Sequence, residues 1–227
     1  MLRTFILLIA TLAFDGLLVA FLTWAFSSPR FAKYRIREGA TMAVPWGRRV
    51  RTMAMIAALS LVAVLGITYV LHDRLLTYAV TPAWAIALQA VAVLLVYDFI
   101  YYFAHRIMHH KKVLRLVHGV HHRARNPSAL ESFYLHPVEL FVGLALLYLA
   151  TFIVGLVTPV HAYAFAASFF VYSTLNILVH SGLDSGTKLL FPIDFLARKH
   201  HVHHMDDPGK NYSSLTPLPD LLFGTSG

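Results

Sequence analysis

The chain has 227 residues, of which 58% are hydrophobic and only 13% are charged, whereas a soluble domain carries charge on about a quarter of its residues. This composition indicates a membrane-embedded protein, and the absence of cysteine excludes disulfides, thiolate metal sites and cysteine nucleophiles. The formal net charge of +8 lies mostly between apolar segments, which favours the positive-inside pattern of a membrane protein and argues against a nucleic-acid partner.

Five segments are apolar and long enough to cross a bilayer, which takes roughly 20 residues of helix. They are Leu2–Phe26, Met53–Leu71, Pro82–Ala104, Val138–Val157 and Ala162–Val179. The first segment lacks a preceding basic cluster and a convincing cleavage site, so we interpret it as a retained span rather than a signal peptide. The sequence therefore predicts an all-α integral membrane protein with about five transmembrane or re-entrant helices.

The connections between these segments differ in charge. Basic residues are concentrated in 27–52, in 105–137 and in the C-terminal tail, whereas 72–81 carries only Arg74. Because basic connections stay in the cytoplasm, we expect the N-terminus to lie outside. The histidine-rich parts of the sequence then all fall on the cytoplasmic side.

Histidines are the second unusual feature of the chain, and most of the 14 fall in tight groups. Residues three and four positions apart share a face of a helix, so each H-x-x-H-H motif can form a three-pronged claw. Neutral imidazole suits Fe, Zn, Cu or Ni. Nine grouped histidines are too many for one ion and about right for two. The nine candidate ligands are His105, His109, His118, His121, His122, His180, His200, His203 and His204.

Five other histidines lie outside this set of candidate ligands. His110 and His201 each neighbour a candidate ligand but lie about 100° around the helix from it, so we do not expect them to bind metal. His72 and His161 are expected on the opposite membrane face, away from the metals. His136 stays open, either as a tenth ligand or as a group that hydrogen-bonds to a ligand.

The ordered set of motifs resembles the fatty acid hydroxylase and sterol desaturase superfamily of membrane di-iron proteins. The resemblance covers roughly residues 95 to 225. Its motifs are Asp98, Tyr101-Tyr102, His105-Arg106 leading into His109, His118-x-x-His121-His122, His136-Pro137-x-Glu139, His180-Ser181-Gly182, His200-x-x-His203-His204, Asn211-Tyr212 and Asp220-Leu-Leu-Phe223-Gly224-Thr225.

This resemblance implies a helical membrane fold whose cytoplasmic cap holds two irons through the histidines of these motifs. It also implies O2-dependent oxidation of a lipid C–H bond. We accordingly divide the chain into 1–94, with N-terminal transmembrane helices and a basic cytoplasmic loop, and 95–227, the di-iron catalytic region. Some members carry a further histidine where this chain has Asn176. Because an amide oxygen ligates metal only weakly, Asn176 is kept as a candidate ligand of an asymmetric site.

Several acids lie near the motifs, and we expect them to orient metal-bound histidines rather than to bind metal. Asp98 is the strongest of them, because an acid near the end of a span is costly without a partner. With Tyr102 and Glu139 it forms the set of candidate catalytic residues. Tyr101 and Tyr102 are equally consistent with an aromatic belt. The six acids are Asp98, Glu131, Glu139, Asp184, Asp206 and Asp207.

Together these features predict a di-iron hydroxylase or desaturase acting on a lipid that the sequence does not name. Two Fe ions, replaceable by Zn, would use O2 as co-substrate. No nucleotide- or flavin-binding glycine motif is present, so electrons are expected from a separate ferredoxin- or cytochrome b5-like protein. The first two spans carry no visible chemistry and are candidates for the walls of a lipid channel.

Two other functions compete with this interpretation. A zinc-dependent membrane hydrolase would need a positioned acid or base, yet no H-E-x-x-H motif occurs, and nine histidines exceed the needs of one catalytic zinc. A non-enzymatic metal transporter or sensor would be expected to place polar residues along a path through the spans. Asp15 is the only acid well inside a span.

Overall fold

The computed structural model describes residues 1–39 and 42–227. Five long helices form its body, and all five are long and apolar enough to cross a membrane. They are α1 (Leu2–Ser27), α2 (Trp46–Leu75), α3 (Ala83–Met108), α5 (Pro137–Gly155) and α6 (Ala162–Val179). The prediction of a helical membrane protein with five spans is therefore confirmed.

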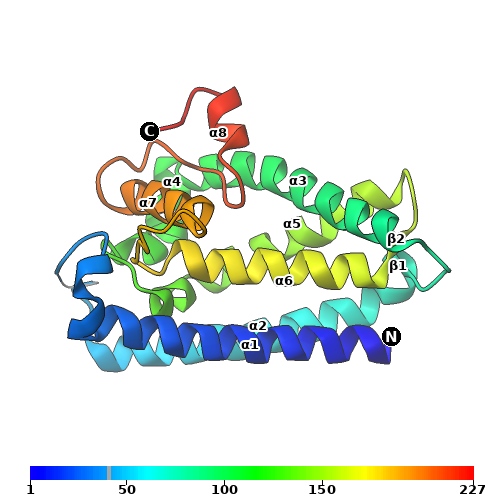
Figure 1. Ribbon diagram of the computed structural model, residues 1–227, viewed down its shortest axis with the longest axis horizontal. Helices are drawn as coiled ribbons and strands as arrows, with labels where there is room; N and C mark the ends of the chain where they lie inside the picture. Colours follow the sequence, from blue (N-terminus) through cyan, green and yellow to red (C-terminus); the bar gives the residue numbers. More distant parts are fainter. Residues whose placement is uncertain (40–41) are drawn as a thin grey trace.

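The short elements gather at the two ends of this bundle (Figure 1). At one end lie α4 (Lys111–Leu116), α7 (Phe191–Met205) and α8 (Leu218–Leu222), with the 3-10 helices η1 (Pro29–Tyr34), η2 (His118–Arg123) and η3 (Ala129–Phe133). At the other end, close to the N-terminus, β1 (Leu76–Thr77) pairs in parallel with β2 (Val160–His161). Apart from this pair and an isolated antiparallel bridge between Arg35 and Leu183, the regular structure of the described residues is helical.

Two of the spans extend further than the apolar runs that predicted them. Helix α2 begins at Trp46 rather than at Met53, and α3 continues past Ala104 to Met108. Hydropathy cannot detect a helix that leaves the bilayer and continues into a polar cap. The extension of α3 places His105 in the last turn of a long, rigid helix.

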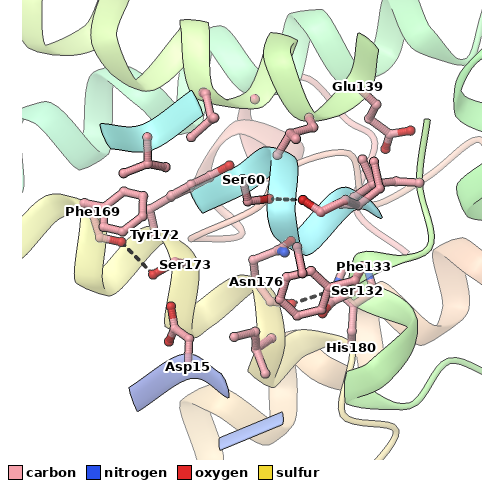
Figure 2. A pocket seen from close by; sticks show the side chains of 18 of the residues that line it. Asp15, Ser60, Ser132, Phe133, Glu139, Phe169, Tyr172, Ser173, Asn176 and His180 are labelled. Carbon is pink, nitrogen blue, oxygen red and sulfur yellow. Dashed lines mark hydrogen bonds between the residues drawn. The ribbon is translucent and has the colours of Figure 1, made fainter. Parts of the chain in front are cut away.

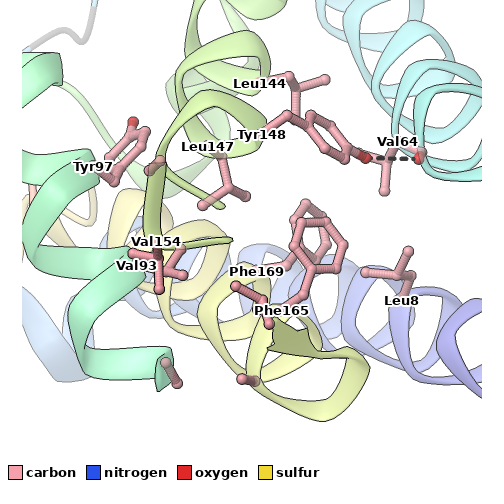
Figure 3. Packing of buried hydrophobic residues seen from close by; sticks show 14 of the residues in the cluster. Leu8, Val64, Val93, Tyr97, Leu144, Leu147, Tyr148, Val154, Phe165 and Phe169 are labelled. Carbon is pink, nitrogen blue, oxygen red and sulfur yellow. Dashed lines mark hydrogen bonds between the residues drawn. The ribbon is translucent and has the colours of Figure 1, made fainter. Parts of the chain in front are cut away.

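The interior of the bundle is closely packed. Helix α3 contacts α5 and α6, and α1 contacts α6. Leu8, Val93, Leu147 and Phe165, from these four helices, are at most 1% exposed and belong to one apolar cluster (Figure 3). Because lipid tails are as apolar as these side chains, close packing rather than removal from water holds such helices together. Large apolar side chains such as Leu17 lie on the outer faces, where lipid would surround them.

Polar contacts join the helices at the end away from α4 and α7. The Nε2 atom of His72 lies 3.1 Å from the Thr4 hydroxyl, and the backbone N–H of His161 donates to Gln89 over 2.9 Å. Both histidines therefore lie at the end where they were expected. At that end they form hydrogen bonds between separate elements of the bundle.

The turn after α6 fixes the start of the polar cap. Gly182 has a φ of +66°, and a Cβ atom there would lie 2.5 Å from the Pro127 carbonyl oxygen. Only glycine fits this conformation without strain. The Gly182 carbonyl accepts a hydrogen bond from the Ile36 backbone, so the chain leaving α6 is tied to the segment that follows α1.

Candidate metal centre

Nine histidines form two groups at the end of the bundle that carries α4 and α7. In each group the potential ligand atoms all lie within 4.8 Å of one another. These are the nine histidines that the sequence analysis selected. The five-histidine group contains His105, His109, His118, His122 and His203, and the four-histidine group contains His121, His180, His200 and His204.

The two groups interleave in the sequence, which corrects the expected three-pronged claws. His118 and His122 join the five-histidine group, whereas His121 joins the other. In the same way, His200 and His204 belong to the four-histidine group, whereas His203 belongs to the five-histidine group. In the α-helix α7, neighbouring residues point about 100° apart, and residues four positions apart differ by only about 40°, so His200 and His204 share a direction that His203 does not. The motif of η2 lies in a 3-10 helix, and its division between the groups follows from the positions of the other histidines around it.

Hydrogen bonds fix which ring nitrogen is free in the five-histidine group. The Nδ1 atom of His105 lies 2.7 Å from the Tyr212 carbonyl, and that of His203 lies 2.6 Å from the Lys210 carbonyl. A carbonyl only accepts, so each Nδ1 carries the proton and each Nε2 carries a lone pair. His118 is held in the same way by its Nδ1 donating to Glu139 Oε1 over 2.9 Å.

The four-histidine group is built on the same principle. His180 donates from Nδ1 to the Asn176 carbonyl over 2.6 Å, and His204 donates from Nδ1 to the Ala124 carbonyl over 2.9 Å. The Nε2 atoms of His180 and His200 face each other at 2.8 Å. The lone pairs of this group therefore converge on one point.

The convergence of lone pairs tests whether the residues fit metal ions. The Nε2 atoms of His105 and His118 are 2.9 Å apart, yet both hold their proton on Nδ1. Two lone pairs at this distance repel, and a cation between them turns the repulsion into coordination. An all-nitrogen donor set suits Fe, Zn, Cu or Ni. The residues thus fit two such ions, and the donor set alone does not choose among these metals.

Burial keeps these histidines neutral, as metal ligands must be. It lowers the pKa of His109 to about 3, with a further contribution from nearby His203. Burial also lowers the pKa of His180 to about 4, although the bond to the Asn176 backbone opposes the shift. The pKa of His203 is lowered by burial to about 4 against a similar bond to the Lys210 backbone. At neutral pH these imidazoles are therefore free to bind metal.

The C-terminal segment supplies part of this support, and two buried aspartates hold the segment in place. Asp98 accepts hydrogen bonds from the backbone N–H groups of residues 214, 215 and 216, over 2.8–3.0 Å. Asp220 accepts from the backbone of Tyr212 over 2.9 Å. Asp98 thus holds the segment whose Tyr212 carbonyl orients His105. Among the described residues no hydrogen bond joins Asp98 to a histidine, so it supports the site through this segment and not, as expected, by orienting a histidine directly.

The other acids have different partners. Among the described residues, Glu139 is the only one of the six whose carboxylate bonds to a histidine of the two groups. Buried Glu131 completes a capping box with Ser128 and pairs with Arg49. The remaining three form ion pairs with basic side chains: Asp184 with Arg198, Asp206 with Arg37, and Asp207 with Lys210.

Several candidate residues lie outside the two groups. Asn176 gives its backbone carbonyl to His180 and lines the adjoining cavity. His136 caps the start of α5, where its Nδ1 accepts from the Val138 backbone over 3.2 Å. Exposed His110 and buried His201 belong to neither group.

The two tyrosines of the first motif have separate surroundings. Tyr102 is buried, bonds to Thr225 over 3.1 Å and stacks on Phe223, so it anchors the C-terminal end. Tyr101 lines the cavity, and its ring centroid lies 5.3 Å from that of His105. Of the pair, Tyr101 rather than Tyr102 lies at the site, and the sequence could not distinguish them.

Sequence reasoning missed the backbone carbonyls that orient the histidines. Those of Ala124, Lys210 and Tyr212 carry no side-chain signature. The only available signal was the motif around Asn211-Tyr212 and Asp220, whose role emerges once the segment is seen folded against α3.

A cavity of about 480 Å³ adjoins the histidines and extends between the long helices (Figure 2). Its volume is in the range of small-molecule binding sites. His105 lines it from the five-histidine group and His180 from the four-histidine group. Its walls come from α1, α2, α3, α5 and α6 and are mainly apolar. The first two spans therefore do line a cavity that reaches the histidines.

The chain was compared with known proteins. The profile of the fatty acid hydroxylase family matches residues 90–225. A methylsterol monooxygenase 1 from Gallus gallus is 32% identical over 149 residues, which cover 63% of this chain and 48% of the relative. A methylsterol monooxygenase 2-2 from Arabidopsis thaliana is 30% identical over 154 residues, or 63% of this chain and 54% of the relative.

A third relative is named for a different reaction. A very-long-chain aldehyde decarbonylase from Oryza sativa subsp. indica is 34% identical over 154 residues, which are 63% of this chain and 54% of the relative. The matches thus span about half the length of these curated relatives. No solved structure matches the chain.

Proposed function

The chain belongs to the fatty acid hydroxylase family, and on that premise we propose that it is a di-iron membrane enzyme that uses O2 to hydroxylate or desaturate a lipid. One observation carries the proposal above all. Two groups of histidines, whose Nε2 lone pairs converge, adjoin a largely apolar cavity between membrane-spanning helices. The histidines can hold a pair of metals for the activation of O2, and the cavity can hold an apolar substrate beside them.

The reaction class follows from the difficulty of the bond. Ordinary acid–base side chains cannot break an unactivated C–H bond, so the irons, when bound, supply the activation of O2. Hydroxylation places one oxygen atom of O2 in the lipid and reduces the other to water, consuming two electrons and two protons. Desaturation removes two hydrogens from the lipid and, with the same electrons and protons, reduces both oxygen atoms to water.

The protein's own residues then bind and position the lipid. Apolar side chains such as Leu12, Ile56 and Leu144 line the cavity, so an alkyl or ring skeleton would displace little ordered water on entry. Tyr101 and His105 lie where this lining meets the histidines. The carbon to be oxidised would therefore be held against the metals in a site that excludes water.

Glu139 is the residue of this site best placed to handle a proton. Its Oε1 holds His118 over 2.9 Å, and its buried Oε2 has no hydrogen-bond partner among the described residues. The residue also lines the cavity. Reduction of O2 consumes protons, so a carboxyl oxygen facing the reaction space can take up a proton and release it there.

Replacing Glu139 with Gln separates these two roles of the carboxylate. The amide oxygen still accepts from His118, whereas the amide nitrogen cannot relay a proton, so we expect metal content to stay and lipid oxidation to fall about a hundredfold. The measurement is metal analysis beside product formation, with the exposed Glu38→Gln as control. Parallel loss of metal and activity would instead mean that Glu139 only positions His118.

The orientation in the membrane and the electron source belong to the same proposal. The histidine groups lie at the end of the bundle opposite the N-terminus. Basic connections at that end, such as the one between α1 and α2 that carries Arg35 and Arg37, support a cytoplasmic location by the positive-inside rule. Electrons would reach the irons from a separate ferredoxin- or cytochrome b5-like protein, which docks on that aqueous face.

The function is tested by removing and restoring the metal. The purified protein, reconstituted in lipid nanodiscs, is supplied with a reductant, O2 and a panel containing a methylsterol, a long-chain aldehyde and a fatty acyl lipid. We expect an oxidised product that disappears with iron chelation and returns with Fe(II) but not with Zn(II). Product formation without iron or without O2 would refute the proposal, and zinc-dependent hydrolysis would favour the hydrolase.

A further inference from the structure

One charged residue lies deep in the bundle without a role in the metal site. Asp15 of α1 is only 3% exposed and lines the cavity that adjoins the histidines. An acid within a membrane span is costly, and such residues commonly serve binding or transport. No ion pair among the described residues involves Asp15, so a basic neighbour does not account for its presence.

The known contacts of Asp15 satisfy only part of its hydrogen-bonding capacity. The Thr174 hydroxyl of α6 donates to Oδ1 over 2.9 Å. The Ser173 hydroxyl is a second hydrogen-bond partner of this carboxylate. A carboxylate offers about four acceptor positions on its two oxygens, so two hydroxyls leave about half of them free. In Figure 2 the side chain lies beside Ser173 on the wall of the cavity, with Asn176 between it and His180.

The cavity of about 480 Å³ that Asp15 lines gives room for a ligand. Gly16 lines it as well and is exposed, so the cavity wall is not closed beside Asp15. Neutral hydroxyl groups of Ser60 and Tyr172 also line it. Hydroxyl groups in the lining suit a neutral polar ligand. A ligand hydroxyl needs a single acceptor, which the free positions of the Asp15 carboxylate provide.

On the basis of the proposed function, we infer that Asp15 binds a hydroxyl group of the lipid substrate and thereby selects hydroxylated lipids. The carboxyl would accept the hydroxyl hydrogen while Thr174 holds it in place. Asp15 is thus a specificity-determining residue on the wall of the cavity, away from the metals.

The helix geometry also predicts where the lipid is oxidised. Thr174, which bonds to Asp15, lies six positions before His180 (180 − 174) in the chain of α6. At a rise of 1.5 Å per residue, this corresponds to about 9 Å along the helix axis. The oxidised carbon should therefore be remote from the hydroxyl group, roughly 9 Å away, rather than next to it.

The test compares two probes that differ in a single hydrogen-bond donor. Binding of hexadecanol and of its methyl ether is measured by scintillation proximity on the full-length, metal-loaded protein in phosphatidylcholine nanodiscs, without reductant so that nothing is turned over. We expect the wild type to prefer the alcohol by on the order of tenfold. This preference should fall to about one in Asp15→Leu and remain in Glu38→Leu, which removes an exposed acid that does not line the cavity.

A second variant, Asp15→Asn, distinguishes loss of the hydroxyl contact from loss of folding. Asp15→Asn preserves volume and one acceptor, so the preference should fall about threefold, because bonds to a neutral group are weaker. Equal weakening of both probes in the Asp15 variants, no preference in the wild type, or no binding of either probe would overturn the inference. An oxidation product modified beside its hydroxyl group would overturn it as well.

The outcome is separable from that of the proposed function. A wild type that prefers the alcohol but oxidises no lipid would refute the oxygenase and leave the hydroxyl site standing. A wild type that oxidises lipids without distinguishing alcohol from ether would uphold the oxygenase and refute the hydroxyl site.

Discussion

Alanine in place of a single histidine in either group is expected to remove one metal ion and to lower lipid oxidation by more than about a hundredfold. Loss of a residue that merely orients a ligand costs about 10- to 100-fold in metal affinity or activity, and loss of the ligand itself should cost more. The effect should be greatest in the four-histidine group, which has no ligand to spare. His200→Ala is the variant of choice there.

The interleaving of the groups makes this prediction specific. His118→Ala/His122→Ala removes two ligands from one group, whereas His121→Ala/His122→Ala removes one from each. We expect the first pair to keep the metal of the four-histidine group and the second pair to weaken both sites, although its residues are adjacent in sequence. Metal stoichiometry of the purified proteins distinguishes these outcomes.

His110→Ala is the matched control for these variants. Its side chain is exposed and belongs to neither group, so metal content and oxidation should stay within twofold of the wild type by the usual tolerance of surface positions. Equal metal loss in both double variants would contradict the two-group arrangement. It would favour a single shared cluster instead.

The sequence was sufficient to predict the spans and the set of histidines. Apolar runs of about 20 residues have few other uses, and spacings of three and four bring side chains to one helix face. Both signals are local, so they survive without knowledge of the fold. The same spacings do not show how the histidines divide between two groups, because the other members of the groups of His121 and His203 come from separate segments of the chain.

The rest of the site depends on contacts that no local pattern encodes. The His203 ring is held by the Lys210 carbonyl and the His204 ring by the Ala124 carbonyl, and every residue has a carbonyl. The partner of Asp98 lies more than a hundred residues away along the chain. An acid near the end of a span signals that a partner exists, but only the folded chain shows that this partner is backbone rather than imidazole.

Removal of the Asp98 carboxylate is expected to destabilise the protein by about 3 kcal/mol or more, because it leaves the backbone N–H groups of three consecutive residues without an acceptor. In Asp98→Ala, the segment carrying Ser214 and Leu215 would lose its attachment to α3. The Tyr212 carbonyl, which lies two residues earlier, would then hold His105 less firmly. Stability and metal binding should therefore fall together.

The measurement is the midpoint of thermal unfolding in detergent, with and without added Fe(II), beside metal content. Asp206→Ala is the control, since its carboxylate is 59% exposed and its pair with Arg37 lies at the surface, where such pairs are worth about 0–1 kcal/mol. Asp98→Asn should fall between, because an amide keeps one acceptor oxygen but turns an NH2 group toward the backbone donors. If Asp98→Asn kept its metal and its stability but lost oxidation, Asp98 would be acting in the reaction itself. The hydrogen bonds to residues 214–216 argue for the opposite result, in which activity falls only as far as the metal is lost.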